Sequence, residues 1–93
     1  MLLHSVVEIE FDPAKDEANF AKHGVALSRA AEFEIQSVER DDRQVRGEVR
    51  FRAFGLLDGR PYSLAFTMRG PAMRVVSLRR SHAKEYRRHV QET

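Results

Sequence analysis

The first apolar and polar positions of the chain alternate in the way that a half-buried strand requires. Between Ser5 and Phe11 the alternation is loose, with Val7, Ile9 and Phe11 on one face and Glu8 and Glu10 on the other. The sequence therefore predicts a first strand over residues 5–11.

Helix signals follow directly after this strand. Asp12 is a favourable N-cap, and Pro13 suits the first position of a helix. Lys22 and His23 favour the negative end of a helix, and Gly24 can adopt the left-handed conformation that ends one. We therefore expect one helix between these two signals.

The next stretch carries weaker signals. A short second helix is expected over roughly Leu27–Ile35, with a poorly marked start because Ala26 cannot cap it. Ser37–Arg40 is consistent with a brief strand, and the polar stretch Asp41–Gly47 is typical of a turn or an exposed loop.

A hairpin gives the clearest pairing signal. Asp58-Gly59 is a preferred two-residue turn, and counting outwards from it pairs Phe51 with Phe66 and Arg50 with Thr67. One face of the hairpin is then apolar and should form the core: Val49, Phe51, Ala53, Leu64, Phe66 and Met68.

The opposite face of this hairpin should display Arg50 and Arg52. Phe54 and Leu56 follow them with the same two-residue period, so we expect both to be exposed on the arginine face. Exposed apolar side chains of this kind could anchor a partner protein.

The last predicted strand includes Val75–Leu78 and runs into Arg79 and Arg80. Ser81 is a suitable N-cap for a C-terminal helix. Two guanidinium groups at such a corner can bind a phosphate in a bidentate manner, although a solvated basic edge is the simpler interpretation. The length of the preceding turn leaves open which of the two arginines shares the face of Arg50.

The C-terminal helix places His82, Glu85 and His89 along one side. These side chains could bind a metal ion, but the face should be exposed and no further ligand is marked, so no metal site is expected. A contact between Glu85 and His89, an interaction of His82 with the helix end, or acid–base chemistry are the favoured alternatives.

The composition limits the class of protein. A chain of 93 residues suits one domain, and the absence of cysteine excludes disulfides, thiol nucleophiles and cysteine metal sites. No apolar run is long enough to span a bilayer, and Glu8 comes too early for a signal peptide. We therefore expect a single domain over residues 1–93 that is located in the cytoplasm and makes no membrane contact.

Charge is distributed unevenly along the chain. Residues 1–42 contain four Lys or Arg against ten Asp or Glu, a balance of −6, whereas residues 43–93 contain twelve against four, a balance of +8. Thirteen of the cations are arginine and three are lysine. Arginine matches the geometry of phosphate and carboxylate groups, so the second part favours binding of nucleic acid or of an acidic partner.

Three blocks of residues form a more specific pattern. They are Phe11-Asp12-Pro13-Ala14-Lys15 with Asn19-Phe20, Lys22-His23-Gly24-Val25 and Ala30; Gly47-Glu48-x-Arg50-Phe51 with Gly55; and Arg74-Val75-Val76-Ser77-x-Arg79-Arg80 followed by Glu85. In this order they resemble the BrnT-type toxins of bacterial type II toxin–antitoxin pairs, over about Ile9 to Glu85.

The resemblance implies both a fold and an activity. The fold would be α+β: a small RelE-like domain with a mostly antiparallel sheet, two N-terminal helices and one C-terminal helix. The activity would be that of a ribonuclease that inhibits translation and needs no cofactor. The partner would be a BrnA-type antitoxin, and because that antitoxin contacts DNA, this chain would meet DNA only indirectly.

A ribonuclease needs no metal if the 2′-hydroxyl of the RNA is the nucleophile. It then requires a base, an acid and positive charge for the transition state. The candidates are Arg50, Arg79 and Arg80 for the phosphate, Glu85 as base, and His23, Lys22 or Tyr86 as acid. Further RNA contacts are expected from Arg52, Arg74, Lys84 and Tyr86.

Simpler interpretations exist for several of these residues and for the whole chain. His23 could only cap a helix, Lys22 could only neutralise the helix dipole, and Glu85 could only brace an arginine. A non-catalytic basic module, or a toxin of the same fold that targets DNA gyrase, are the alternatives to a ribonuclease. Catalysis differs from the first alternative in requiring Glu85 and the arginines to converge on one cleft.

Overall fold

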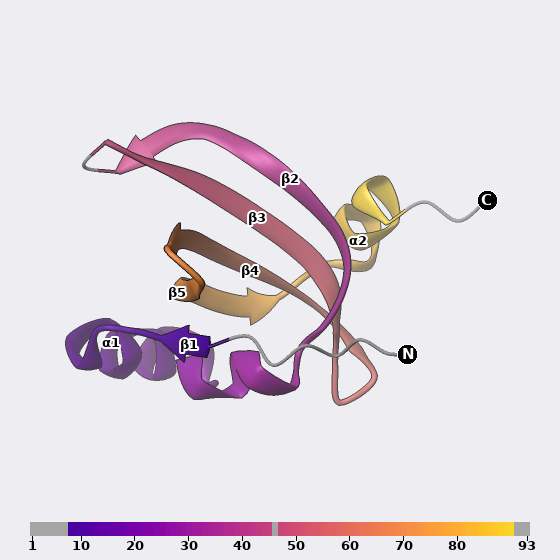
Figure 1. Cartoon of the computed structure of the whole chain (residues 1–93). Coiled ribbons are helices and arrows are strands. Elements are labelled where there is room, and N and C mark those ends of the chain that lie inside the picture. The colour runs from indigo at the N-terminus through magenta and orange to yellow at the C-terminus, as the bar shows by residue number, and fades with distance from the viewer. Residues whose placement is uncertain (1–7, 46, 91–93) are drawn as a thin grey trace, which may run out of the picture.

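A computed structural model describes residues 8–45 and 47–90. The elements in chain order are β1 (Glu8–Glu10), α1 (Pro13–His23), the 3-10 helix η1 (Leu27–Glu32), β2 (Glu34–Val45), β3 (Glu48–Leu57), β4 (Arg60–Arg69), β5 (Ala72–Arg80) and α2 (Ala83–His89). They form one five-stranded sheet in the order β1-β5-β4-β3-β2 (Figure 1). Only the short β1 pairs in parallel, with β5, so the predicted α+β class with a mostly antiparallel sheet and a C-terminal helix is confirmed.

The first helix forms as its end signals predict. The Asp12 side chain accepts a hydrogen bond from the Ala14 backbone N–H at 3.0 Å, and Pro13 is the first helical residue. Gly24 ends the helix at φ 74° and donates its N–H to the Phe20 carbonyl. The preceding strand is described from Glu8 onwards; residues 5–7 of its predicted range lie outside the described residues.

The second predicted helix is a 3-10 helix, and it ends at Glu32 rather than Ile35. Ala26 makes no side-chain cap, as expected, but the Leu27 N–H donates to Asp16 Oδ1 at 2.7 Å. The cap therefore comes from α1 and not from the local sequence. Leu27 is fully buried behind this contact.

The prediction of a short strand at residues 37–40 and a loop after it was wrong. Strand β2 runs for 12 residues, and its polar end pairs with β3: Asp41 lies opposite Arg50, and Val45 lies opposite Glu48. A register shift lies between Asp41 and Gln44. The stretch is polar because β2 is an edge strand, and an edge strand needs little apolar surface.

The predicted turn and register of the hairpin between β3 and β4 are confirmed from Arg50 to Leu57, but Met68, which was expected in the core, is 43% exposed. The register runs from Arg50 opposite Thr67 to Leu57 opposite Arg60, with Asp58 and Gly59 at φ 55° and 74° in the turn. The apolar face of the hairpin packs with β5, α1 and η1 into one core, which includes Leu27, Phe33, Ala53, Leu57, Leu64, Phe66, Val75 and Leu78.

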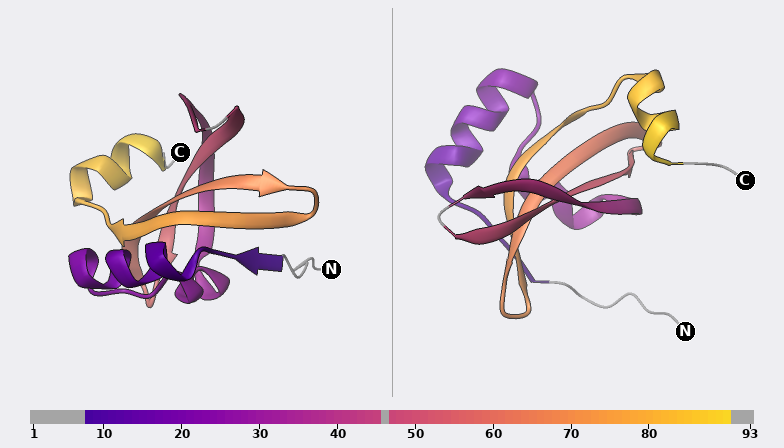
Figure 2. Two further views of the ribbon diagram at one scale, coloured as in Figure 1. Left: turned by 90° about the vertical axis from the view of Figure 1, so that its left-hand side faces the viewer. Right: turned by 90° about the horizontal axis from the view of Figure 1, so that it is seen from above.

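The two long helices lie on different sides of the sheet, with α1 and η1 against the core face and α2 against the arginine face (Figure 2). The position of α2 contradicts the prediction that Phe54 is exposed. Phe54 is 0% exposed, because its ring stacks on His89 of α2 with 4.1 Å between the ring centroids. It is therefore not an exposed anchor on the arginine face, and Leu56 is half-buried.

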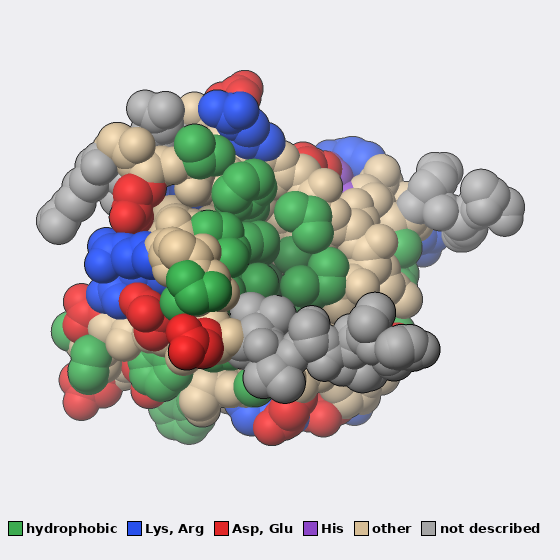
Figure 3. Space-filling view, in the orientation of Figure 1, with side chains coloured by type: hydrophobic (Ala, Val, Ile, Leu, Met, Phe, Trp, Pro, Cys, Tyr) green, Lys and Arg blue, Asp and Glu red, His purple; other side chains and the backbone are tan. Residues whose placement is uncertain are grey.

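The core face extends beyond the helices that cover it. Phe51 and Phe66 stack with 5.4 Å between their centroids, and Val38 and Met68 nearby are exposed. A group of apolar side chains is visible over this part of the molecule (Figure 3). The longest helix in the described ranges has 11 residues, and none is long and apolar enough to cross a bilayer.

Candidate active site

The arginine face of the sheet consists of side chains in register across β3, β4 and β5. Arg52 lies opposite Ala65, and Ala65 lies opposite Ser77. One step along, Phe54 lies opposite Ser63, and Ser63 lies opposite Arg79. Side chains that are cross-strand partners point to the same face, so Arg79 shares the face of Arg50 and Arg52.

A β-bulge decides which of the two corner arginines faces the site. The pairing of β4 with β5 shifts by one residue between Ala65 and Phe66, so that Val76 is the extra residue on β5. Without this shift every later side chain of β5 would point to the other face. The open question from the sequence is thereby answered: Arg79 faces the site and Arg80 does not.

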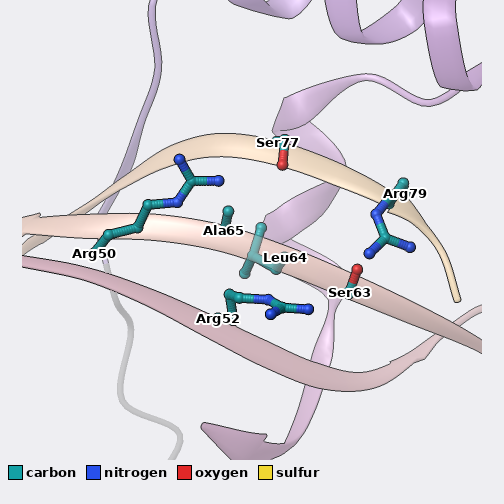
Figure 4. Close-up of a pocket in the computed structure, with 7 residues that line it drawn as sticks. All are labelled: Arg50, Arg52, Ser63, Leu64, Ala65, Ser77 and Arg79. Carbon is teal, nitrogen blue, oxygen red and sulfur yellow. The ribbon is translucent and has the colours of Figure 1, made fainter. Parts of the chain in front are cut away.

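Three arginines surround an open pocket of about 190 Å³. Figure 4 shows Arg50 and Arg52 from β3 and Arg79 from β5 around it. The rest of the lining comes from the small residues Ser63, Ala65 and Ser77 and from Leu64, whose side chain lies in the core on the other face of the sheet. Small residues in the middle of the face leave room above the sheet, and the longer arginines enclose that room.

Glu85 of α2 joins these arginines. Its two carboxylate oxygens accept hydrogen bonds from Arg79 Nη1 and Nη2 at 3.1 and 3.0 Å, and Arg52 Nη2 lies 3.6 Å from Glu85 Oε2. The hydrogen bonds from Arg79 hold the pKa of Glu85 below its ordinary value of 4.5, against the opposing effect of burial. Glu85 is therefore ionised at neutral pH.

Helix α2 is held over this face by contacts that the sequence did not reveal. Besides the stack on Phe54, His89 Nδ1 lies 2.6 Å from Glu39 Oε2, and the Tyr86 hydroxyl donates a hydrogen bond to Gln36. Both partners belong to β2, which is adjacent to β3. These contacts fix the helix that carries Glu85. Its N-cap is His82, without a side-chain hydrogen bond, instead of the predicted Ser81.

Helix α1 approaches the site from the edge of the sheet. Beyond the short β1, Asn19 takes the place of a neighbouring strand: its Nδ2 donates to the Leu78 carbonyl at 2.9 Å, and its Oδ1 accepts from the Leu78 N–H at 3.2 Å. Its Nδ2 also donates to the Val25 carbonyl. Asn19 is buried, and it connects α1, the chain after Gly24 and β5 in one arrangement.

The end of α1 brings His23 and Lys22 beside the arginine pocket. Both residues line a second hollow with Lys15, Val76 and Ser77, and Ser77 also lines the pocket of the three arginines. Burial and, to a smaller extent, the positive charges of Lys22 and Arg79 hold the pKa of His23 below its ordinary value of 6.5. His23 is therefore mostly neutral at pH 7.

Not all of the predicted residues converge. Arg80 is exposed, and its guanidinium lies 5.9 Å from the centroid of the Tyr62 ring. Lys84 is exposed on α2, and Arg74 is held by Glu10, with Nη1 donating to Oε1 at 3.0 Å. None of these three lines the pocket of Arg50, Arg52 and Arg79.

The histidines of α2 do not form a metal site with Glu85. His89 contacts Glu39 and Phe54, while Glu85 is bound to Arg79 and His82 is exposed. Within residues 8–45 and 47–90, no group of three or more His, Asp or Glu is placed to hold a metal ion.

Sequence reasoning missed the small residues and the inner contacts of the site. Ser63, Ala65 and Ser77 form its floor; Ser77 belongs to the third block of the sequence pattern but was not assigned to the site. The register of the β3–β4 hairpin does predict Ser63 and Ala65, because they lie opposite Phe54 and Arg52. Ser77 could not be placed without knowing the bulge.

Known proteins share this fold. The crystal structure of the Brucella abortus ribonuclease toxin BrnT is similar with a TM-score of 0.63 and 24% sequence identity, over 82% of this chain and 97% of that one. No curated protein matches the chain at a significant level. A family model described as "Ribonuclease toxin, BrnT, of type II toxin-antitoxin system" matches residues 11–85, from the start of α1 to Glu85. The chain therefore belongs to the BrnT family of ribonuclease toxins of type II toxin–antitoxin systems.

Proposed function

We propose that this chain cleaves RNA in the pocket of Arg50, Arg52 and Arg79 without a metal ion. The 2′-oxygen of the RNA forms a bond to phosphorus while the bond from phosphorus to the 5′-oxygen breaks. The products are a 2′,3′-cyclic phosphate and a free 5′-hydroxyl. Three arginines line one pocket and an ionised carboxylate contacts two of them, and this arrangement carries the proposal.

The arginines bind and stabilise the phosphate that reacts. Negative charge develops on the phosphorane oxygens in the transition state, and guanidinium groups fixed in place stabilise that charge. Arg79 is fixed by Glu85 and by a hydrogen bond from Nη1 to the Arg80 carbonyl at 3.2 Å. Its orientation therefore costs little when substrate binds.

Glu85 is the proposed base for the 2′-hydroxyl. In the free protein its hydrogen bonds to Arg79 reduce its basicity. A phosphate that binds Arg79 competes for the same N–H donors, and the carboxylate then recovers affinity for a proton. Substrate binding thereby activates the base.

His23 is the proposed acid for the leaving 5′-oxygen. It stands on the other side of Ser77 from the arginine pocket, with Lys22 next to it. An imidazole with a lowered pKa gives up its proton readily once it is protonated. Lys22 contributes positive charge to the same side.

A non-catalytic basic module explains less of this arrangement. A surface that only attracts nucleic acid gains nothing from a carboxylate among its arginines, because the carboxylate reduces the positive field. The position of Glu85 between Arg79 and Arg52 therefore favours catalysis.

The experiment uses purified chain free of antitoxin and an end-labelled RNA, with and without a chelator. We expect the same cleavage in both conditions, a 2′,3′-cyclic phosphate on the product, and no cut where the 2′-hydroxyl is replaced by hydrogen. Arg79→Gln and Glu85→Gln should reduce cleavage strongly, while Arg60→Gln, an exposed arginine outside the pocket, should not. Full dependence on a divalent ion would contradict the mechanism.

A type II toxin has an antitoxin protein as its partner. We propose that this partner is a BrnA-type antitoxin that covers the arginine face with an acidic segment and so excludes RNA, which would otherwise be cut and translation inhibited. Complementary charge between the two proteins would make their association fast and sensitive to salt.

A further inference from the structure

A row of five side chains crosses the whole sheet beside the arginine pocket. Arg50 lies opposite Asp41 on one side and Thr67 on the other, while Arg74 lies opposite Thr67 and Glu10. Two arginines thus flank a central threonine, and a carboxylate closes each end. We call these five residues the Thr67 row.

The centre of the row is a buried hydroxyl without a partner. Thr67 is 3% exposed, and its Oγ1 makes no hydrogen bond to any described residue. A buried hydroxyl in this state costs free energy. Thr67 lines an open pocket of about 250 Å³, although its Oγ1 is itself closed to solvent in the free protein, so a ligand reaches the hydroxyl only when neighbouring side chains move. The other lining residues are Asp12, Lys15, Glu48, Arg50, Arg69, Arg74 and Val76.

The carboxylates at the two ends of the row orient the two arginines, and each arginine retains N–H donors for a ligand. Arg74 Nη1 donates to Glu10 Oε1 at 3.0 Å, and Arg50 Nε lies 3.5 Å from Asp41 Oδ2 without a hydrogen bond. A guanidinium has five N–H groups, so each arginine retains several for other acceptors. A ligand with several anionic oxygens, such as a phosphate, fits this set of donors.

Each of the two acidic residues of the pocket accepts one hydrogen bond from a protein N–H. Glu48 Oε2 accepts from Arg69 Nε at 3.0 Å, and Asp12 accepts from the Ala14 N–H. Lys15 adds a positive charge at the same pocket. The uncommitted donors therefore outnumber the uncommitted acceptors around Thr67.

We propose that the Thr67 row binds a second phosphate of the RNA, next to the one that is cleaved. The proposal rests on the ribonuclease function, and Arg50 connects the two sites because it lines both pockets. Thr67 is two residues along β4 from Ala65, which lines the arginine pocket, and two residues of a strand span about 7 Å. This spacing suits two neighbouring phosphates of one RNA better than a single phosphate.

The test replaces single phosphates and single side chains in combination. The probe is a labelled RNA made uncleavable by 2′-O-methyl groups, with one neutral methylphosphonate moved along it, and affinity is measured by fluorescence anisotropy. For the parent protein, the affinity for the RNA should fall about tenfold when the methylphosphonate replaces one particular phosphate outside the cut bond. Thr67→Val and Arg74→Gln should already bind the unmodified RNA more weakly, and lose little more at that position.

Further controls separate the possible failures. Arg74→Gln should reduce the slope of log K against log salt concentration by about one. Arg60→Gln is the matched control, and methylphosphonates in the RNA should weaken its binding as they weaken that of the parent. If Thr67→Val folds poorly, Arg74→Gln still provides the test.

Two results would overturn the inference in different ways. In the first, the parent cleaves RNA, and a methylphosphonate at any position of the RNA weakens binding by the variants as much as binding by the parent. The row then binds no phosphate, and the ribonuclease function stands. If the parent neither binds nor cleaves RNA, the proposed function fails and the subsite fails with it.

Discussion

Asn19 shows how one polar side chain positions the elements around the arginine pocket. Its amide forms two hydrogen bonds with Leu78 and one with Val25, all within the buried interior. Leu78 precedes Arg79, so the same contact that attaches α1 to the free edge of β5 also places His23 near the arginine pocket. An amide is suited to this task because it donates and accepts at once.

Replacing Asn19 with alanine should lower the free energy of unfolding by about 3 kcal/mol, because three buried backbone groups lose their partner. Urea unfolding at equilibrium measures this loss. Glu17→Gln, an exposed change on the same helix, should stay within about 0.5 kcal/mol of the parent. A loss as small as that of Glu17→Gln would show that the amide contacts do not hold the helix.

The two titrating groups of the site predict the pH dependence of cleavage. Glu85 must be ionised to act as base, and its pKa lies below 4.5; His23 must be protonated to act as acid, and its pKa lies below 6.5. The plot of kcat/KM against pH, which reports the free enzyme, should therefore peak on the acidic side of neutrality and fall as pH rises through the pKa of His23.

His23→Gln should lower the rate and abolish the fall at higher pH, while Glu85→Gln should abolish the fall at lower pH. A rate in the parent that rises as pH passes through the pKa of His23 and stays high at neutral pH would reverse the assignment and make His23 the base.

At the scale of the elements, the close approach of β2 and β3 depends on a residue without a side chain. A Cβ added at Gly55 would lie 2.0 Å from the Glu34 carbonyl oxygen, which is backbone and cannot move aside alone. Gly55 lies next to the register shift between Ile35 and Ser37. The geometry of β2, and with it the attachment of α2 through Gln36 and Glu39, therefore rests on this position.

Gly55→Ala should lower the free energy of unfolding by about 3 kcal/mol, in the range of changes that force backbone to shift. It should also reduce cleavage, because α2 carries Glu85. Gly59→Asn in the hairpin turn is the matched control, since asparagine tolerates a positive φ, and it should cost less than about 1 kcal/mol. Equal effects of the two changes in thermal and urea unfolding would argue against a special role for Gly55.

Local signals predicted the elements whose ends are determined by their own residues. Helix α1 and the β3–β4 hairpin follow from Asp12-Pro13, Gly24 and Asp58-Gly59, whose effects act over a few residues. The extent of β2, the burial of Phe54 and the choice between Arg79 and Arg80 depend on partners elsewhere in the fold. The pairing of Glu85 with Arg79 was considered as a bracing contact, but its place on the face of Arg50 and Arg52 depends on the bulge in β5 and on the docking of α2.

At the scale of the whole molecule, the sheet separates two kinds of surface. One side carries the arginines and α2, and the other carries the core, α1 and the exposed apolar residues Val38 and Met68. An antitoxin that neutralises the toxin by covering the RNA site must dock on the first side. A substitution on each side can therefore show which side of the sheet binds the antitoxin.

Arg50→Glu should slow association with the antitoxin about tenfold at low salt, because the charge that attracts an acidic segment is reversed. Val38→Ser, an exposed change on the opposite side, should leave association unchanged. Stopped-flow or surface-binding kinetics across a salt series, with an RNA cleavage assay on the complex, measure both effects. Slower binding of Val38→Ser alone, with RNA still cut in the complex, would place the antitoxin on the apolar side.

The alternation of side chains along β3 has an evolutionary consequence. Phe51 and Ala53 point into the core, while Arg50 and Arg52, which alternate with them, point to the pockets, so neighbouring codons should be under separate kinds of selection. If the proposed site is correct, a change at Arg50 or Arg52 would affect binding of the phosphate and of the antitoxin and would leave the core intact. Under that proposal, a lineage could alter or lose the arginine site and still keep the fold.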